Sequence, residues 1–308
     1  MNITKNTMPN NVIVNKKGNR RIKDGLFVCS IVIPAVLFFI IFIYYPFSKN
    51  IYYVFMDYDY IHKPTFVGLD NIKKFFTDPY ALNALKNSFL ITFISVPLVL
   101  SVSLLLSVAL FNLKRFQGIF RSAIFSTYLV PLVVASVIFK LLFGTESGMI
   151  NSILNAFGIE NINWLTKPGL AMLCVIIINI WNGTGYYMVI FLAGLSNVDS
   201  QLYEAAYVDG AGPVRVFFSI TLPTLKPTIL FGGVFATITY LRTFITIEIL
   251  TEGGPYRSTE TIIKYMFDQG FESRNVGYAS LLAIIIFLIS LIISLIQIKL
   301  TNDDERKV

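Results

Sequence analysis

The sequence predicts an all-α integral membrane protein that crosses the bilayer with six helices. Of its 308 residues, 55% are hydrophobic and only 14% are charged, whereas a soluble domain carries about 25% charged residues. A bilayer core about 30 Å thick requires roughly 20 apolar residues in helical form, so long apolar runs indicate the crossings. Six such runs occur, at residues 26–47, 88–111, 122–143, 170–194, 228–250 and 278–298.

The first run follows a basic stretch and has to be distinguished from a secretory signal. This stretch contains Lys16, Lys17, Arg20, Arg21 and Lys23. The apolar run is longer than the core of a signal peptide, and no obvious small-residue cleavage site follows it. We therefore expect a retained transmembrane helix.

Basic residues also predict the orientation, because short cytoplasmic segments are rich in Lys and Arg. The N-terminal tail (1–25) and the loop with Lys114, Arg115 and Arg121 both fit the cytoplasmic side. With six crossings, the C-terminal tail (301–308) is cytoplasmic as well. The net charge of +7 is spread over tails and loops and forms no clustered basic face, so no nucleic-acid partner is predicted.

One membrane domain, residues 26–300, covers the chain between the tails. The long outer segment after its first span contains a predicted amphipathic helix. Asp70 is expected to cap the N-terminus of this helix, and Ile72, Phe75 and Phe76 form its apolar side. We expect the helix to lie along the membrane surface.

The most informative segment, residues 201–223, lies between the fourth and fifth spans. It predicts a helix at 201–208, a turn at Gly210 and a second helix that begins at Pro213. Pro223 is expected to limit the continuation of that second helix. Without further information the segment could be an ordinary helical hairpin on the surface.

The spacing within this segment is much more specific than its composition. Glu-Ala-Ala at 204–206 is followed after three residues by Gly210, and after nine more by Ile-Thr-Leu-Pro at 220–223. This pattern resembles, without departure, the signature loop of importer-type ABC permeases. The likeness extends over almost the whole chain and is greatest to the first-permease group of binding-protein-dependent sugar systems, of the maltose, multiple-sugar and glycerol-phosphate type.

The resemblance implies the type I importer permease fold, in which the loop forms a cytoplasmic coupling helix that rests in a groove of the ATPase. It assigns this coupling role to Glu204, Ala205, Ala206, Asp209, Gly210, Ile220, Leu222 and Pro223. It also implies the partners: a second homologous permease, two copies of a cytoplasmic ABC ATPase and an extracytoplasmic solute-binding protein. The expected location is the cytoplasmic membrane of a prokaryote, within the lipid bilayer.

The chain itself is predicted to be a non-catalytic transport subunit without a cofactor. It contains no Gly-x-x-x-x-Gly-Lys-Ser/Thr phosphate loop, so ATP hydrolysis is expected from the separate ATPase subunits. No Cys/His metal set occurs, and His62, the sole histidine, is expected to be a solvated loop residue without a partner. Cys29 and Cys174 fall within predicted spans, so no structural disulfide is expected.

Polar residues inside spans indicate a candidate solute path, because they are costly in lipid unless they pair or line a wet cavity. By similarity to maltose-type permeases, the sugar-contacting positions correspond to Tyr128, Asn179, Asn182, Gly183, Tyr186, Phe235, Thr239 and Arg242. Amides, hydroxyls and aromatic rings suit a carbohydrate. The same groups could instead satisfy neighbouring helices, as polar residues often do in bundles.

The fifth span is unusual because it carries both Arg242 and Glu248. Six positions separate them, so they do not share a helical face and no intrahelical ion pair is expected. Many relatives have a glutamine-and-aspartate pair where this chain has Arg242-Thr-Phe244, which leaves the solute class open. Arg242 could meet an anionic or acidic-sugar substrate, or it could pair with the partner permease.

Two other interpretations follow from the sequence. The chain could serve the same class of importer for a non-sugar solute, since permeases for several solute types share the Glu-Ala-Ala loop. It could also be an ATP-independent carrier, which would usually show inverted repeats or broken helices in matching halves. An intramembrane enzyme would require paired catalytic groups at one depth of the bilayer, for which Arg242 and Glu248 offer too little.

Overall fold

The computed structural model describes residues 30–113 and 115–305, so Cys29, Lys114, the whole predicted N-terminal tail and the last three residues of the C-terminal tail lie outside the described residues. The chain divides into two units, Met1–Tyr52 and Tyr53–Val308. In the first unit, a helical stretch begins at Ser30, passes through the π-helical turn η1 (Ile40–Tyr44) and continues as α2 (Tyr45–Val54). Ser30–Val54 is long and apolar enough to cross a membrane.

The second unit contains four further helices that are long and apolar enough to span a membrane, together with one bent pair of helices. The long helices are α4 (Pro79–Phe111), α8 (Pro168–Ser196), the continuous stretch Pro213–Leu241 and the apolar part of α14 (Val276–Glu305). The described residues therefore hold five candidate spans, or six if the bent pair is one span. This fold is the expected all-α, multi-pass architecture.

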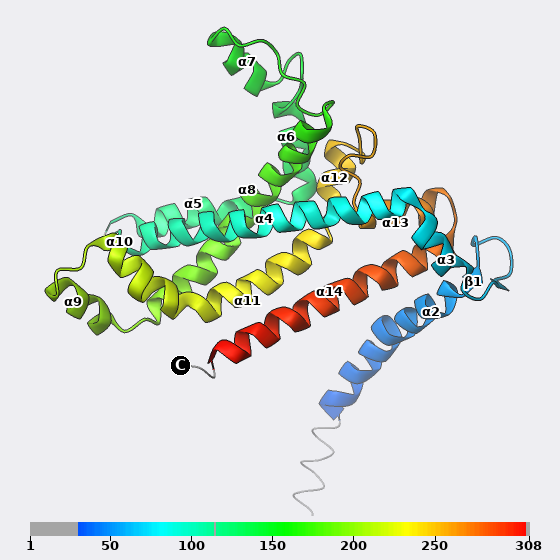
Figure 1. Cartoon of the computed structure of the whole chain (residues 1–308), viewed down its shortest axis with the longest axis horizontal. Helices are drawn as coiled ribbons and strands as arrows, with labels where there is room; N and C mark the ends of the chain where they lie inside the picture. Colours follow the sequence, from blue (N-terminus) through cyan, green and yellow to red (C-terminus); the bar gives the residue numbers. More distant parts are fainter. Residues whose placement is uncertain (1–29, 114, 306–308) are drawn as a thin grey trace, which may run out of the picture. The chain divides into compact units, whose positions relative to one another are not determined.

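Helix α8 lies at the centre of the second unit, where it packs against α4, α5 (Gln117–Leu129) and α11 (Leu222–Leu241). Figure 1 shows α4, α11 and α14 running roughly alongside one another, with α8 crossing them. One core cluster joins Val99 of α4, Phe191 of α8 and Leu225 of α11, all of which are fully buried or nearly so. The polar pockets described below lie among these helices.

The third predicted span, residues 122–143, is not a single straight helix. It consists of α5 and α6 (Leu132–Leu142), which meet at an angle of 93°. The break falls at Val130 and Pro131, where Val130 has an extended ψ of 123°. The ring of a proline disfavours the helical conformation of the residue before it, which explains why the helix stops there. A short helix, α7 (Met149–Ala156), follows in the next loop.

The fifth predicted span, residues 228–250, also differs from expectation. The helix begins much earlier, with α10 (Pro213–Val216), and runs through the π-turn η2 (Phe217–Thr221) into α11. Pro223 therefore does not end the helix, because it lies in the first turn of α11, directly after a π-turn that loosens the regular hydrogen bonding. The helix ends instead at Leu241, before the short helix α12 (Ile245–Leu250).

The segment after the first span forms a two-stranded antiparallel sheet and then a helix. The strands are β1 (Met56–Asp57) and β2 (Thr65–Phe66), and the helix is α3 (Asp70–Thr77). Asp70 does not cap this helix as predicted, because the helix begins at Asp70 itself and the carboxylate binds Nζ of Lys73 at 2.9 Å. Phe75 is buried as expected, whereas Phe76 is 69% exposed.

The last elements before α14 are α13 (Ile262–Phe267) and the π-turn η3 (Asp268–Glu272). Asp78 joins this region to α4. One of its carboxylate oxygens caps α4 by accepting from the N–H groups of Tyr80 and Ala81. The other oxygen accepts from the hydroxyls of Tyr265 and Tyr278, at 2.6 and 2.7 Å. Burial alone would raise the pKa of Asp78, but these four hydrogen bonds outweigh it and lower the pKa.

Candidate functional site: a polar pocket and a projecting helix

The connection between α8 and α10 forms the helix-turn-helix that the sequence predicts. Its helix α9 (Ser200–Val208) is capped by Asp199, whose carboxylate accepts from the N–H of Gln201 at 2.9 Å. Gly210 has a φ of +75°, which glycine adopts at little cost. Pro213 then occupies the first turn of α10. Figure 1 shows α9 beyond α10 at one end of the second unit.

None of the nine residues of α9 is buried, and the hairpin exposes apolar side chains both in α9 and in α10. Val208 is 87% exposed and Val214 is 70% exposed. A short helix held away from the bundle with apolar residues on its surface is suited to contact another protein. Glu204 lies on this helix, and it lines a pocket of about 350 Å³ together with Tyr203 and Phe111.

The other predicted coupling residues lie in and after this hairpin. Ala205 and Ala206 belong to α9, and Asp209 terminates it. Ile220 falls in the π-turn η2, while Leu222 and Pro223 begin α11. The predicted set therefore extends from the projecting helix into the start of the fifth span.

A second site lies between α5, α8 and α11, where the structure gathers the predicted sugar-contacting residues around two adjoining pockets. The first pocket, of about 180 Å³, is lined by Tyr128, Asn182, Gly183, Tyr186, Tyr187, Phe235, Thr239 and Tyr240. The second, of about 320 Å³, is lined by Leu132, Asn179, Asn182, Thr239, Tyr240, Arg242, Thr243, Phe244 and Ile245. Each of the eight predicted residues lines at least one of the two pockets.

Aromatic rings and amides give the first pocket its character. The rings of Tyr128 and Tyr186 lie 4.8 Å apart between centroids, which brings α5 and α8 together. The amide of Asn182 donates to the carbonyl of Thr127 at 3.0 Å, and the hydroxyl of Tyr240 donates to the carbonyl of Asn179 at 3.1 Å. These contacts hold polar groups beside ring faces, an arrangement that can bind a ligand with both hydroxyls and apolar C–H surfaces.

Gly183 is required where α8 passes α11. A Cβ atom at this position would collide with the hydroxyl oxygen of Tyr240. Tyr240, which lines the first pocket beside Tyr187, was not among the residues predicted for the solute path. An aromatic residue in an apolar run gives no signal that separates a pocket wall from an ordinary core position.

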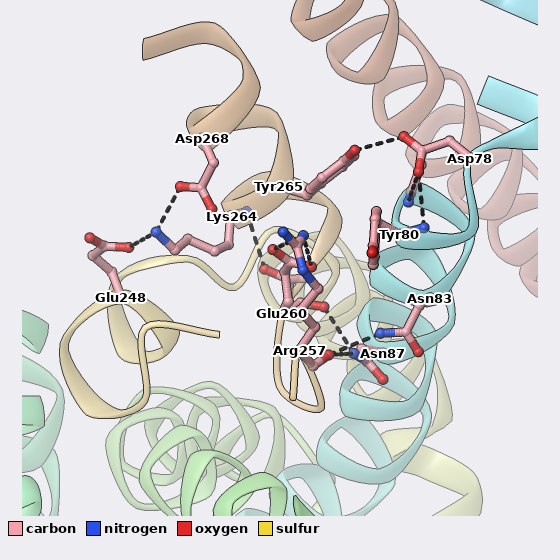
Figure 2. A network of polar contacts seen from close by, with 12 residues as sticks. Asp78, Tyr80, Asn83, Asn87, Glu248, Arg257, Glu260, Lys264, Tyr265 and Asp268 are labelled. Atoms are coloured by element: carbon pink, nitrogen blue, oxygen red, sulfur yellow. Dashed lines mark hydrogen bonds and ion pairs between the residues drawn. The ribbon is translucent and has the colours of Figure 1, made fainter. Parts of the chain in front are cut away.

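The two charges of the fifth span do not pair with each other. Glu248 instead forms an ion pair with Nζ of Lys264 at 2.8 Å, and the same Nζ binds Asp268 at 2.7 Å (Figure 2). Burial would lower the pKa of Lys264, but its two carboxylate partners outweigh this effect and raise the pKa. Arg242 lies at the end of α11, where its side chain is exposed and lines the second pocket.

A further polar network fastens the loop after α12 to α4. Nη1 of Arg257 lies 3.0 Å from both carboxylate oxygens of Glu260. The carbonyl of Arg257 accepts from the amides of Asn83 and Asn87, as Figure 2 shows. Burial raises the pKa of Glu260 although Arg257 opposes this change. These contacts could not be predicted from the sequence.

The two remaining predictions concern His62 and the cysteines. His62 is solvent-exposed as expected, but it has a partner, since its Nδ1 lies 2.6 Å from a carboxylate oxygen of Asp59. The backbone N–H of His62 gives the largest contribution to lowering the pKa of Asp59 to about 2. Cys174 is a free, fully buried residue of α8, in agreement with the expected apolar role.

A multi-pass helical bundle with a polar pocket among its spans and a short helix projecting between two of them defines a membrane permease. Residues 88–301 match the family described as binding-protein-dependent transport system inner membrane component. The chain belongs to this family. It is thus the membrane-embedded transport subunit of an ABC importer and not the subunit that hydrolyses ATP.

Curated relatives agree with this assignment, and a solved structure shares the fold. The chain is 34% identical to the sulfoquinovosyl glycerol transport system permease protein SmoG of Agrobacterium fabrum, over 92% of each chain. It is also 34% identical to the arabinooligosaccharides permease AraP of Bacillus subtilis, over 87% of this chain and 86% of that protein. A chain of a bacterial alginate ABC importer shares the fold, with a TM-score of 0.85 at 22% identity, covering 94% of this chain and 99% of that one.

Proposed function

We propose that the transported solute is a carbohydrate that binds in the two adjoining pockets between α5, α8 and α11. The observation that carries this proposal is the combination of the neighbouring rings of Tyr128 and Tyr186 with the amide of Asn182 in one pocket. Sugar rings have apolar faces and polar edges, and such a pocket provides partners for both. Relatives named for sulfoquinovosyl glycerol, lactose and arabinooligosaccharides support the same solute class.

The chain acts in a complex with a second homologous permease, two copies of an ABC ATPase and an extracytoplasmic solute-binding protein. The exposed helix α9 is the element that contacts the ATPase, with Glu204 as its acidic contact residue. This role places α9 and both termini on the cytoplasmic side of the membrane. Closure of the ATPase subunits on ATP moves α9, and the attached start of α11 transmits this movement to the pocket.

Purification of the chain from its native membrane tests this proposal. We expect an ATPase, a second permease and a binding protein to co-purify with it. When a panel of neutral and acidic sugars is tested, we expect one class of sugar to stimulate ATP hydrolysis at least about threefold. Recovery of the chain without any ATPase would support an ATP-independent carrier instead. Recovery of the complex with stimulation by a non-sugar solute alone would contradict the carbohydrate assignment.

The pocket itself is tested by Gly183→Ala. The added methyl group displaces the Tyr240 hydroxyl into the pocket. We therefore expect sugar-stimulated ATP hydrolysis to fall about tenfold, which corresponds to a loss of about 1.4 kcal/mol in the free energy of sugar binding. Gly233→Ala is the matched control on α11, because a Cβ there meets its nearest atom only at 3.8 Å. Adding Tyr240→Phe to Gly183→Ala removes the colliding hydroxyl and is expected to restore part of the activity. Full activity of Gly183→Ala alone would place the solute elsewhere.

A further inference from the structure

The break in the fifth span places a cation beside the proposed solute pocket. Helix α11 ends at Leu241, and Arg242 follows with a φ of −100° and a ψ of 19°. Arg242 is exposed and lines the second pocket together with Asn179 and Asn182. A charged residue at the level of a membrane span carries a free-energy cost, which a counter-charge or a wet cavity must offset.

Within the described part of the chain, no carboxylate forms an ion pair with Arg242. Glu248, the acidic residue of the same predicted span, is held by Lys264 at 2.8 Å. Asp268 binds the same lysine at 2.7 Å and is therefore also engaged. No Asp or Glu lines the second pocket. The positive charge of Arg242 thus has no internal compensation from these acids.

A second, independent observation is the amide of Asn179. This side chain is only 4% exposed, and its Nδ2 has no hydrogen-bond partner. The residues that line the second pocket with it include Thr239 and Thr243, whose hydroxyls donate to the carbonyls of Phe235 and Tyr240 at 2.8 Å, and neither of them accepts from this Nδ2. A buried N–H group without a partner is costly, so a ligand that brought an acceptor to Asn179 would remove this cost.

The second pocket therefore offers unpaired donors, one of them charged. A sugar hydroxyl could accept from Asn179, but it would leave the charge of Arg242 uncompensated. A carboxylate accepts hydrogen bonds at both oxygens and matches the planar guanidinium with two parallel bonds. An anionic oxygen group satisfies the amide and the charge together.

We propose that the solute is an acidic sugar whose carboxylate, or an equivalent oxyanion, binds Arg242 and Asn179 in the second pocket. The uncharged part of the sugar lies in the adjoining pocket, against Tyr128 and Tyr186. This inference deepens the proposed function and rests on it, because it assumes that a carbohydrate occupies these pockets.

The test uses the complete complex with its binding protein in lipid nanodiscs. The probes are uronic-acid disaccharides, each measured beside its methyl ester, which has nearly the same shape without the charge, and beside a set of neutral disaccharides. Stimulated ATP hydrolysis gives KM and kcat for the unchanged complex and for Arg242→Gln. Because the same binding protein delivers the sugar to both forms, a difference between them reports the membrane site.

We expect a uronate to stimulate the unchanged complex, with its methyl ester at least about tenfold weaker. Arg242→Gln should raise the KM for the uronate about 10- to 100-fold, as is typical for loss of a charged hydrogen bond. Asn179→Asp should have a similar effect without loss of side-chain volume, because the new carboxylate competes for Arg242. The control Lys140→Gln, which removes a cation of α6 that lies 3.9 Å from Glu252 and outside both pockets, should leave the KM unchanged.

Each other outcome has a distinct meaning. Stimulation by neutral disaccharides or methyl esters as strong as by uronates, with Arg242→Gln unaffected, would overturn the acidic-sugar inference and leave the carbohydrate importer intact. Two results together would assign Arg242 to the interface between the permeases and overturn the inference. The Arg242→Gln complex would lose its second permease, and the Asn179→Asp complex would respond equally to neutral and acidic sugars. Failure of every sugar to stimulate would overturn the carbohydrate proposal itself.

Discussion

Replacement of Gly210 by proline is expected to abolish sugar-stimulated ATP hydrolysis and uptake while the chain remains inserted in the membrane. Gly210 has a φ of +75°, whereas proline is restricted to about −65°. The substitution also removes the N–H of residue 210, which donates to the carbonyl of Tyr207 at 3.1 Å. Both changes force the turn after α9 to another geometry, so α9 can no longer present Glu204 and its apolar surface in the same direction.

A matched substitution separates this effect from simple loss of glycine. Asparagine visits the left-handed region more readily than other residues with a side chain, and a Cβ at position 210 meets no atom within 4 Å. We therefore expect Gly210→Asn to keep at least about half of the stimulated activity, and Gly210→Pro to retain less than about a tenth. Uptake into proteoliposomes and ATP hydrolysis are measured on the same preparations. Normal coupled uptake by Gly210→Pro would refute the transmission role of α9.

Much of the helical architecture could be predicted because a membrane imposes a simple rule on sequence. A long apolar run indicates a helix, and the described elements α4, α8 and α14 correspond to predicted runs. The hairpin around α9 was predictable for a different reason, since Gly210 and Pro213 have strong local preferences. In both cases the residues that predict the structure lie close to one another in the sequence.

The breaks within spans were not predictable in the same way. Hydropathy continues through Val130 and Pro131 without interruption, although α5 and α6 meet there at 93°. It also continues past Arg242, where α11 ends. A proline or a polar residue can kink a span, end it or be tolerated within it, and the packing of neighbouring helices determines which of these occurs. Pro97, for example, is tolerated inside α4.

Long-range polar contacts are a second feature of the fold that could not be predicted from the sequence. Asp78 binds Tyr265 and Tyr278, which are 187 and 200 positions away. Nothing in a single sequence connects residues at such a distance. Polar residues within an apolar span drew attention to Asn179 and Asn182, a family resemblance supplied the full set of eight, and the structure adds to them the neighbour Tyr240.

Replacement of Lys264 by methionine is expected to destabilise the end of the bundle that contains α12 and α13 by about 2–3 kcal/mol. The side chain of Lys264 is only 6% exposed, and it holds the carboxylates of Glu248 and Asp268, whose side chains are 35% and 21% exposed. Loss of one partner of a fully buried ion pair costs about 3–5 kcal/mol, and the value here is smaller because water reaches both carboxylates. Methionine has a similar volume, so packing is largely kept.

The stability is measured as the apparent melting temperature of the complex in nanodiscs, where about 2 kcal/mol corresponds to a decrease of roughly 4–8 °C for a chain of this size. Lys264→Arg retains the positive charge, so its decrease in melting temperature should be less than half of the decrease for Lys264→Met. The decisive comparison is the triple variant Lys264→Met, Glu248→Gln, Asp268→Asn, in which no unpaired carboxylate remains at this site. We expect it to melt above Lys264→Met alone, because the cost comes from two uncompensated negative charges rather than from the missing ammonium group. A triple variant no more stable than Lys264→Met would show that Lys264 acts through packing and not through its charge.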